Sequence, residues 1–335
     1  MTMTYAWQTA LVDVVTDPEE LLKILGLDLK LLPAAQAASA LFPLKVPRGF
    51  INRIEKGNPD DPLLRQILPL HAECLTEPGY DVDPLNEKSV NPIPGLLHKY
   101  HGRVLLTLAG TCGINCRFCF RRHFPYTENN PGVAGWDKIM AYIERDASIT
   151  EIILSGGDPL ILNDHSLQAF TDLLTDLPQI KRLRIHSRIP IVLPERITPT
   201  FLAWLNQLHI KPILVTHCNH PREIDPTVKQ AFVALQKSSA VLLNQAVLLK
   251  GINDNVETLI ALSEALFDIG IQPYYLHLLD KTAGTAHFDC DQQTAFQLHQ
   301  ELSARLSGYL VPKLVYEKPG AEGKILLGSG SFCTD

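Results

Sequence analysis

The sequence lacks any long run of apolar residues, and this absence limits where the protein can act. Its 335 residues contain no stretch of about 18 or more apolar residues, the length that spans a bilayer. The first residues, MTMTYAWQTA, also lack the basic region and long apolar core of a secretory signal. We therefore expect a cytoplasmic protein with no membrane partner.

An excess of positive charge is also missing. The chain carries 30 Lys and Arg against 36 Asp and Glu, for a formal net charge of -6. Proteins that bind nucleic acid generally show a basic surplus, so we expect no nucleic-acid partner. Apolar residues make up 46% of the chain, which suffices for a sizeable core in one large domain or two modest ones.

Cysteine is scarce, and its distribution argues against a disulfide framework. The seven cysteines form an odd, scattered set: Cys74, Cys112, Cys116, Cys119, Cys218, Cys290 and Cys333. Three of them fall within the short stretch GTCGINCRFCFRR, which begins at Gly110. This cluster indicates a metal or redox site, and we expect the other four to be plain thiols.

The chain divides into three predicted parts. Residues 1–99 form an N-terminal helical region and arm, residues 100–290 the core, and residues 291–335 a C-terminal helix and a short segment around Lys324. In the first part, Asp17-Pro18-Glu19-Glu20 favours a helix start and Gly26 a stop. The proline-rich stretch 78–94 predicts a long arm.

From Arg103 onward, short apolar runs alternate with amphipathic stretches. The predicted strands are Val104–Leu108, Ile152–Leu154, Leu183–His186, Ile213–Thr216, Val241–Val247 and Tyr274–Leu279. The predicted helices between them include Trp136–Arg145, Ser166–Thr175, Pro226–Gln236 and Val256–Phe267. Such alternation predicts an α/β fold with a parallel sheet covered by helices.

Polar residues follow the ends of successive predicted strands. They include the cysteine cluster, the Ser155–Asp158 stretch, Arg188, His217 and Asp280. (β/α) barrels build their active sites at the carboxyl ends of the strands, whereas open sheets bind ligands at a switch point. We therefore predict a partial (β/α)6 TIM-like barrel.

The spacing C-x3-C-x2-C supplies three thiols for a metal site that usually needs four ligands. A structural zinc site would need a fourth ligand, for which His123 is a weak candidate. An ordinary ferredoxin cluster would need a fourth cysteine, and none fits. A non-catalytic zinc or iron–sulfur protein is the alternative from another functional class.

This loop resembles the signature of radical S-adenosylmethionine enzymes. The resemblance implies that Cys112, Cys116 and Cys119 hold a [4Fe–4S] cluster whose fourth iron is open to S-adenosylmethionine. The stretch Ser155-Gly156-Gly157-Asp158 is similar to the motif of that family that contacts the methionine amino group. Glycines at the end of a strand let the backbone approach a ligand closely.

The segment PGAEGK, which ends at Lys324, resembles the lysine turn of the lysine 2,3-aminomutase family. The resemblance implies that Lys324 binds pyridoxal 5′-phosphate (PLP), which can delocalise an unpaired electron. Further residues matching family positions near PLP or S-adenosylmethionine are Lys99, Tyr100, Arg103, His217 and Gln245. Lys99 stands where the family often has arginine.

Three residues match the family positions that hold the substrate. Arg121 matches the clamp for the substrate carboxylate, a role suited to a planar guanidinium. Asp280 and Glu317 match the acidic pair that holds the ε-ammonium of lysine, although aspartate is more typical at the second position. The resemblance therefore implies an isomerase that converts L-α-lysine to β-lysine.

The sequence ends at Asp335, a short distance after Lys324. This short form, with PGAEGKILLGSG, resembles the aminomutases that make (R)-β-lysine for modification of elongation factor P. The resemblance implies a ligase that acts on that factor, a reductant such as flavodoxin or ferredoxin, and a homo-oligomer. The alternative within this chemistry is a free-standing metabolic lysine 2,3-aminomutase or another amino-acid 2,3-aminomutase.

Overall fold

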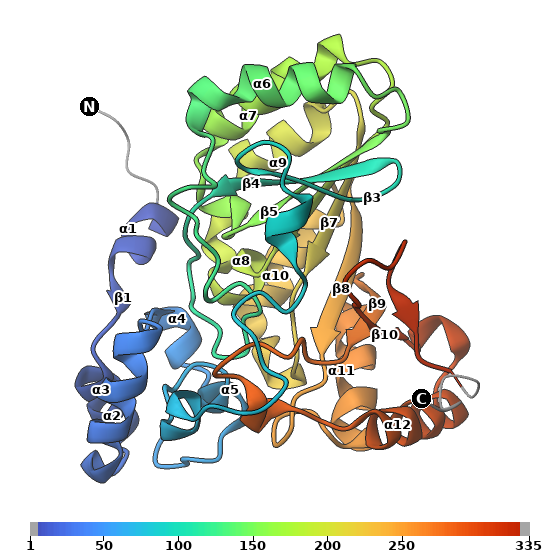
Figure 1. Cartoon of the computed structure of the whole chain (residues 1–335). Coiled ribbons are helices and arrows are strands. Elements are labelled where there is room, and N and C mark those ends of the chain that lie inside the picture. The colour runs from blue at the N-terminus through green and yellow to red at the C-terminus, as the bar shows by residue number, and fades with distance from the viewer. Residues whose placement is uncertain (1–5, 329–335) are drawn as a thin grey trace.

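The computed structural model describes residues 6–328, and its centre is a curved sheet of nine strands (Figure 1). The spatial order is β11-β10-β9-β8-β7-β6-β5-β4-β3. From β4 to β10 each neighbouring pair is parallel, while β3 and β11 pair antiparallel at the two edges. The strands are β3 Leu96–Tyr100, β4 Arg103–Ala109, β5 Glu151–Gly156, β6 Arg182–Ser187, β7 Lys211–Thr216, β8 Val241–Val247, β9 Gln272–His277, β10 Lys313–Tyr316 and β11 Ile325–Leu326.

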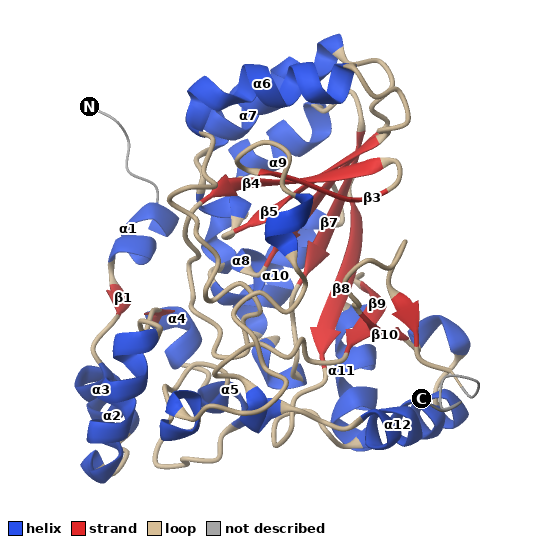
Figure 2. Cartoon of the chain, in the orientation of Figure 1, coloured by secondary structure: helices blue, strands red, loops and turns tan. Residues whose placement is uncertain are grey.

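Helices connect the parallel strands and cover one side of the sheet (Figure 2). They are α6 Gly132–Glu144, α7 Asp164–Asp172, α8 Ile189–Val192, α9 Pro199–Gln207, α10 Pro226–Leu235, α11 Val256–Asp268 and α12 Gln292–Arg305. Several begin at a side-chain cap: Thr198 accepts a bond from the Phe201 amide, and Asp225 accepts one from the Val228 amide. Each of these caps precedes a proline, whose fixed φ suits the first helical position.

The two faces of the parallel strands serve different purposes. Val104 and Leu106 of β4, like Leu183 and Ile185 of β6, are fully buried in the apolar core. Side chains alternate between the faces of a strand, so the residues between these positions point to the concave side of the sheet. That side carries the polar side chains described below.

The N-terminal region forms a separate group of short elements beside the sheet, drawn in blue in Figure 1. Its elements are α1 Ala6–Val12, β1 Val14–Val15, α2 Pro18–Leu25, α3 Leu32–Leu41, β2 Val46–Pro47, α4 Arg48–Ile51 and α5 Pro62–Arg65. Asp17 caps α2, and Gly26 ends it with a left-handed φ of 64°, as the sequence predicts.

The predicted partial barrel is confirmed, and all six predicted strands are present. Three further strands of the sheet were not predicted: β10, which extends the parallel part, β11, which pairs with β10 at the edge, and β3, which starts within the N-terminal region at Leu96. The domain boundaries at residues 99 and 290 stay predictions. Cys333 and the last residues of the C-terminal motif lie outside the described residues.

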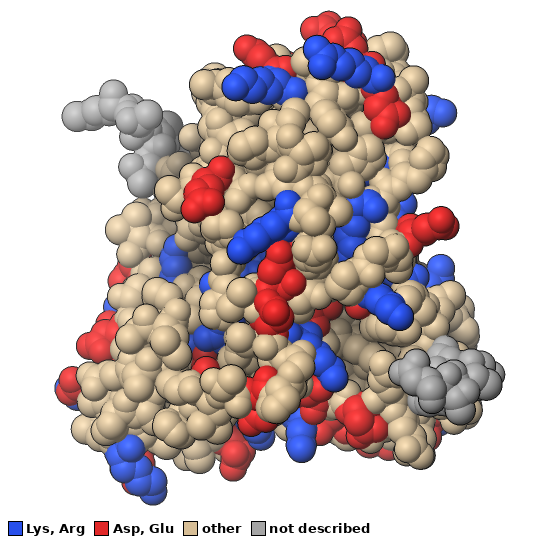
Figure 3. All heavy atoms as spheres, in the orientation of Figure 1, with Lys and Arg blue, Asp and Glu red and all other residues tan. Residues whose placement is uncertain are grey.

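Charged residues of both signs are interspersed over the face drawn in Figure 3. Within residues 6–328, no helix has the length and apolar character needed to cross a bilayer.

A buried ionic cluster fixes the cysteine loop to the N-terminal region. Glu73 accepts hydrogen bonds from Arg117 at 2.9 Å and from Arg122 at 2.8 Å, and all three side chains are almost completely buried. Arg117 and Arg122 flank Cys119 in sequence, so one carboxylate holds both ends of this part of the loop. The Asn115 amide also donates to the Lys45 carbonyl at 2.9 Å.

We predict that Glu73→Gln destabilises the fold by about 3–5 kcal/mol, because it leaves two buried guanidinium groups without their counter-charge. Urea unfolding followed by circular dichroism measures this loss. Glu19→Gln is the matched control, since its pair with Lys23 is exposed to solvent and its loss should leave the stability nearly unchanged. Equal losses in the two variants would contradict the anchoring role of Glu73.

Candidate active site

A cavity of about 430 Å³ lies on the concave side of the sheet. Apart from His123, every residue that the sequence analysis singled out as a ligand, cofactor contact or substrate contact lines it. These are Lys99, Tyr100, Arg103, Cys112, Cys116, Cys119, Arg121, Ser155, Gly156, Gly157, Asp158, His217, Gln245, Asp280, Glu317 and Lys324. The fold thus brings residues that lie far apart in the sequence, from Lys99 to Lys324, into one cavity.

The three cysteines lie in the loop after β4 and face one end of this cavity. Burial, with Asp158 and the other two cysteines acting in the same direction, raises the pKa of the Cys112 thiol. Burial and Cys116 likewise raise the pKa of Cys119 to about 11. The three sulfurs therefore lie close enough to interact, and their thiolate forms need a nearby cation.

A single zinc ion and an iron–sulfur cluster make different demands on these thiols. A zinc ion needs its ligands about 2.0–2.3 Å from one point. Among residues 6–328 no three His, Cys, Asp or Glu side chains are arranged around such a point. His123, the weak zinc candidate, instead contacts the Ala283 carbonyl at 3.0 Å through Nε2. A [4Fe–4S] cluster takes each thiolate on a different iron, so it accepts more widely spaced sulfurs.

The glycine stretch after β5 packs against the start of the cysteine loop. Gly156 has a φ of 98°, and a Cβ on Gly157 would lie 2.3 Å from the Thr111 carbonyl oxygen. Glycine is therefore required here for the two loops to meet. The Gly157 amide donates to the Ala109 carbonyl, and the Asp158 amide donates to the Thr111 carbonyl. These bonds hold the stretch in place, and residues 155–158 line the cavity.

The carboxylate of Asp158 is engaged by the protein itself. It accepts hydrogen bonds from the Ser187 hydroxyl at 2.7 Å and from the amides of Leu160, Arg188 and Ile189. Asp158 thereby links the loop after β5 to the loop after β6. Because the Asp158 side chain is engaged in this way, we expect the backbone of residues 155–157 to make any contact with S-adenosylmethionine.

Arg121 lies buried between Glu87 and Ser155. Its Nε and Nη2 donate to the two carboxylate oxygens of Glu87 at 2.7 and 2.6 Å, and its Nη1 donates to the Ser155 hydroxyl at 3.1 Å. Burial opposes the charge on Arg121, but Glu87 outweighs it and raises the pKa of the guanidinium. Glu87 belongs to the proline-rich arm, so the arm crosses the cavity and fixes the orientation of Arg121.

Three histidines line the middle of the cavity in neutral form. Burial lowers the pKa of His217 to about 3 and lowers those of His186 and His277 well below the ordinary value. His217 Nε2 lies 2.8 Å from the Gln245 amide nitrogen. The Nε2 atoms of His186 and His277 are buried without a hydrogen-bond partner in the described part of the chain. Such unpartnered polar atoms fit a polar cofactor in this space.

Lys324 lies at the other end of the cavity, next to Glu317. Glu317 binds the Lys324 ammonium, accepts from Lys99 at 2.7 Å and accepts from the Tyr100 hydroxyl at 3.0 Å. Burial alone would raise the pKa of Glu317, but Lys324 and Lys99 outweigh it and lower that pKa. Lys324 also lies 5.8 Å from the centre of the Tyr275 ring.

Asp280 follows β9 and differs from the other acidic residues of the cavity. In the described region no donor hydrogen-bonds to its carboxylate, whereas Glu87 and Glu317 are fully paired. Burial, followed by the charge of Glu317, raises the pKa of Asp280 to about 7. An unpaired carboxylate in this state gains the most from a cation placed against it.

Several residues of the cavity received no ligand, cofactor or substrate role in the sequence analysis, which noted Arg188 only for its position after a strand. They are Glu87, Arg184, His186, Arg188, Tyr275 and His277. Four of them alternate with apolar residues on two strands, as in Arg184-Ile185-His186 and Tyr275-Leu276-His277. Polar residues at every second position of a buried strand could have indicated that one face of the strand lines a polar site. Glu87 gave no such signal, because its partner lies far away in the sequence.

Two asparagines close in sequence to His217 and Gln245 bind backbone groups of the protein. Asn244 accepts from the Cys218 amide at 2.9 Å and donates to the Cys218 carbonyl at 3.1 Å. Asn219 accepts from the Val247 amide at 2.9 Å. They join the ends of β7 and β8 and so position the neighbouring His217 and Gln245.

The residues present fit the three groups that the resemblance implies. Three neighbouring half-buried thiols suit an iron–sulfur cluster, and the glycine backbone beside them suits the polar end of S-adenosylmethionine. At the other end, Lys324 lies among Lys99, Arg103 and unpartnered histidine nitrogens, a setting that suits an anionic aldehyde such as PLP.

Comparison with known proteins places the chain among named relatives. It is 51% identical to the L-lysine 2,3-aminomutase of Escherichia coli over 95% of this chain and 93% of that protein. It is 46% identical to that of Haemophilus influenzae, over 96% and 95%. It is 36% identical to that of Clostridium subterminale, over 82% of this chain and 66% of that protein.

No protein-family model matches the chain. Among solved structures, a radical SAM methyltransferase from Sphaerobacter thermophilus is similar with a TM-score of 0.48 and 18% identity, over 66% of this chain and 68% of that one. The extent and identity of the match to the E. coli and H. influenzae proteins decide the assignment: the chain belongs to the lysine 2,3-aminomutase family of enzymes.

Proposed function

We propose that this enzyme converts L-lysine to β-lysine by moving the amino group from C2 to C3. One observation carries the proposal: a single cavity holds the three cysteines, Lys324, Arg121 and the unpaired carboxylate of Asp280. The cofactors of the family are a [4Fe–4S] cluster, S-adenosylmethionine and PLP. The first two supply a radical that takes a hydrogen from the substrate, and PLP supplies a conjugated system that delocalises the unpaired electron while the nitrogen moves.

The chain would hold these groups with residues already in place. Cys112, Cys116 and Cys119 would ligate the cluster, and the backbone of residues 155–157 would contact S-adenosylmethionine. Lys324 would hold PLP, with Lys99 and Arg103 near enough to neutralise its phosphate. The remaining side chains would bind and orient lysine.

Arg121 is the proposed partner of the substrate carboxylate. Glu87 occupies its Nε and Nη2, so the remaining protons on Nη1 and Nη2 are those available to a ligand. This fixed presentation orients the substrate without a change of rotamer. Neutral His217 lines the same cavity as Arg121 and Lys324, which supports a contact between its ring and the bound substrate or cofactor.

Asp280 is the proposed partner of the ε-ammonium, with Glu317 as a second acid. Glu317 is bound to Lys324 in the structure. A Lys324 that held PLP would no longer offer a free ammonium to Glu317, and one oxygen of that carboxylate would be left for the substrate. Glu317 would then help to bind the substrate only with the cofactor in place.

We further propose that the product is (R)-β-lysine and that a ligase attaches it to elongation factor P. The resemblance of PGAEGKILLGSG to the aminomutases of that modification supports this proposal. A flavodoxin or ferredoxin as reductant, a homo-oligomeric state and a cytoplasmic location also stay predictions.

The decisive test is incubation of the anaerobically reconstituted protein with L-lysine, PLP, S-adenosylmethionine and reductant. We expect (R)-β-lysine by chiral chromatography, and its transfer to elongation factor P when the ligase is added. An S product would remove the elongation-factor role and favour the metabolic alternative. A cluster whose spectrum does not respond to S-adenosylmethionine would favour a non-catalytic protein.

Borohydride treatment of the PLP-loaded protein should attach the cofactor covalently to Lys324, because a lysine amine forms a reducible linkage with its aldehyde. Peptide mass spectrometry locates the attachment. Lys324→Ala should lose it, whereas Lys318→Ala, a change of an exposed lysine on the same turn, should retain it. Attachment at another lysine in the wild-type protein would refute the assignment.

The raised pKa of Asp280 gives a pH prediction. Only its charged form binds an ammonium group, so kcat/KM for lysine should fall as the pH drops below about 7. Asp280→Asn should lower kcat/KM about a hundredfold and abolish this dependence, since losing one partner of a buried charge pair costs about 2–5 kcal/mol.

Asp60→Asn, at an exposed aspartate of the N-terminal region, is the matched control and should leave the pH profile unchanged. Binding of S-adenosylmethionine should also be unaffected in Asp280→Asn. An equal loss of S-adenosylmethionine binding and lysine turnover would argue against an ammonium-binding role.

A further inference from the structure

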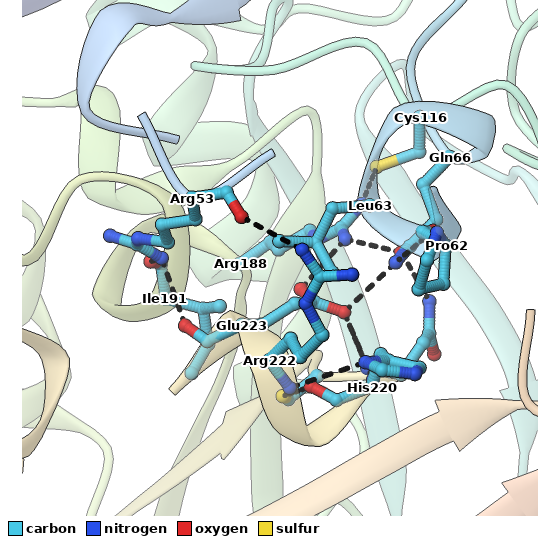
Figure 4. Close-up of polar contacts among 12 residues, drawn as sticks. Arg53, Pro62, Leu63, Gln66, Cys116, Arg188, Ile191, His220, Arg222 and Glu223 are labelled. Atoms are coloured by element: carbon cyan, nitrogen blue, oxygen red, sulfur yellow. Dashed lines mark hydrogen bonds and ion pairs between the residues drawn. The ribbon is translucent and has the colours of Figure 1, made fainter. Parts of the chain in front are cut away.

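Arg188 connects one cysteine of the loop to a buried polar network (Figure 4). It lies between β6 and α8, and its Nη1 donates to the Sγ of Cys116 at 2.8 Å. Its Nη2 donates to Gln66 Oε1 at 2.6 Å and to Glu223 Oε2 at 2.9 Å. The sulfur and the carboxylate are thus bridged by one guanidinium.

Several further contacts hold this guanidinium in position. Glu223 is fully buried, and its Oε1 accepts from the amides of Asn219 and His220 and from the Gln66 side chain. The backbone amide of Arg188 donates to Asp158 at 2.7 Å. The guanidinium also lies between two aromatic rings, with its carbon 5.6 Å from the centre of Phe50 and 5.5 Å from that of Phe118.

We propose that Arg188 sets the reduction potential of the cluster through its hydrogen bond to Cys116, and that Glu223 and Gln66 act as positioning residues for it. The inference rests on the proposed function, because it takes Cys116 as a cluster ligand. The contact differs from the others around the loop: Arg117 and Arg122 are directed at Glu73, whereas Arg188 points at a sulfur.

The physical basis is the extra negative charge that the cluster gains on reduction. A donor on a ligand sulfur stabilises the more negative state and therefore raises the potential. Glu223 neutralises the charge of Arg188 at a distance, so the directed N–H bond is what reaches the sulfur. Removing the carboxylate alone would leave a net positive charge beside the cluster.

These two effects have opposite signs and can be separated. The double variant Arg188→Met, Glu223→Gln removes the hydrogen bond but keeps the local charge balance, and its midpoint potential should become more negative. At a fixed solution potential, the ratio of reduced to oxidised cluster should fall roughly tenfold, the scale of one hydrogen bond to a charged group. Glu223→Gln alone should shift the potential the other way.

Arg222→Gln is the matched control for the loss of a positive charge. Arg222 lies at the edge of the same network, where it pairs with Asp61 and contacts the Arg53 carbonyl but not Cys116 (Figure 4). Its variant should keep the wild-type potential.

The measurement is an anaerobic redox titration of the reconstituted cluster without lysine, followed by electron paramagnetic resonance, with iron content determined for each variant. An unchanged or more positive midpoint in a fully loaded double variant overturns the role of Arg188. Should the double variant lose its iron, Glu223→Gln decides, and an unchanged or more negative midpoint there overturns the inference. A wild-type protein that assembles no [4Fe–4S] cluster overturns the proposed function itself.

Discussion

The carboxylate of Glu317 connects the two edge strands of the partial barrel, and the cavity lies on the concave side between them. β3 and β11 are the edge strands and do not pair with each other in the described structure. Glu317, which follows β10, binds Lys99 and Tyr100 from the end of β3 and Lys324 from the start of β11. These contacts bridge the gap between β3 and β11 on the concave side. The groups involved are charged and largely buried, so each needs a nearby counter-charge to stay ionised.

At the opposite end, the cysteine loop has a comparable anchor. Glu73 supplies it by pairing with Arg117 and Arg122, and Asp158 and Arg188 connect the loop to the ends of β5 and β6. The N-terminal helices therefore do more than cover the barrel. They provide the counter-charges that hold the loop in one conformation, as a site that must place several ligands within a fraction of an ångström requires.

Local patterns made the strands and the main helices predictable, while the contacts that shape the site were not. The runs that became β4 to β9 are apolar and bounded by turn residues, so their existence follows from the sequence alone. β10 has only four residues, Lys313–Tyr316, and carries no such signal. Glu73 and Glu87 meet their arginines across 44 and 34 residues, a relation that no spacing rule reveals.

Asp158 illustrates the reverse difficulty. Its position near the end of a strand suggested contact with a ligand, yet its carboxylate accepts hydrogen bonds from Ser187 and from backbone amides of neighbouring loops. A sequence places such a residue near a site but does not reveal whether its polar atoms face the ligand or the protein. That distinction depends on which donors the folded chain leaves unsatisfied.

The charges of the cavity argue for a substrate with an extra ammonium group. Glu87 is neutralised by Arg121, and Glu317 by Lys99 and Lys324, so both carboxylates are occupied before any ligand binds. Asp280 alone has no partner among the described residues, and its raised pKa reflects that state. An amino acid with a neutral side chain would leave this carboxylate buried and unpaired, whereas an acidic one would add repulsion. The ε-ammonium of lysine would supply the missing counter-charge. The charged form of Asp280 is unfavourable in the free enzyme, so its pairing with this ammonium would contribute to the binding free energy.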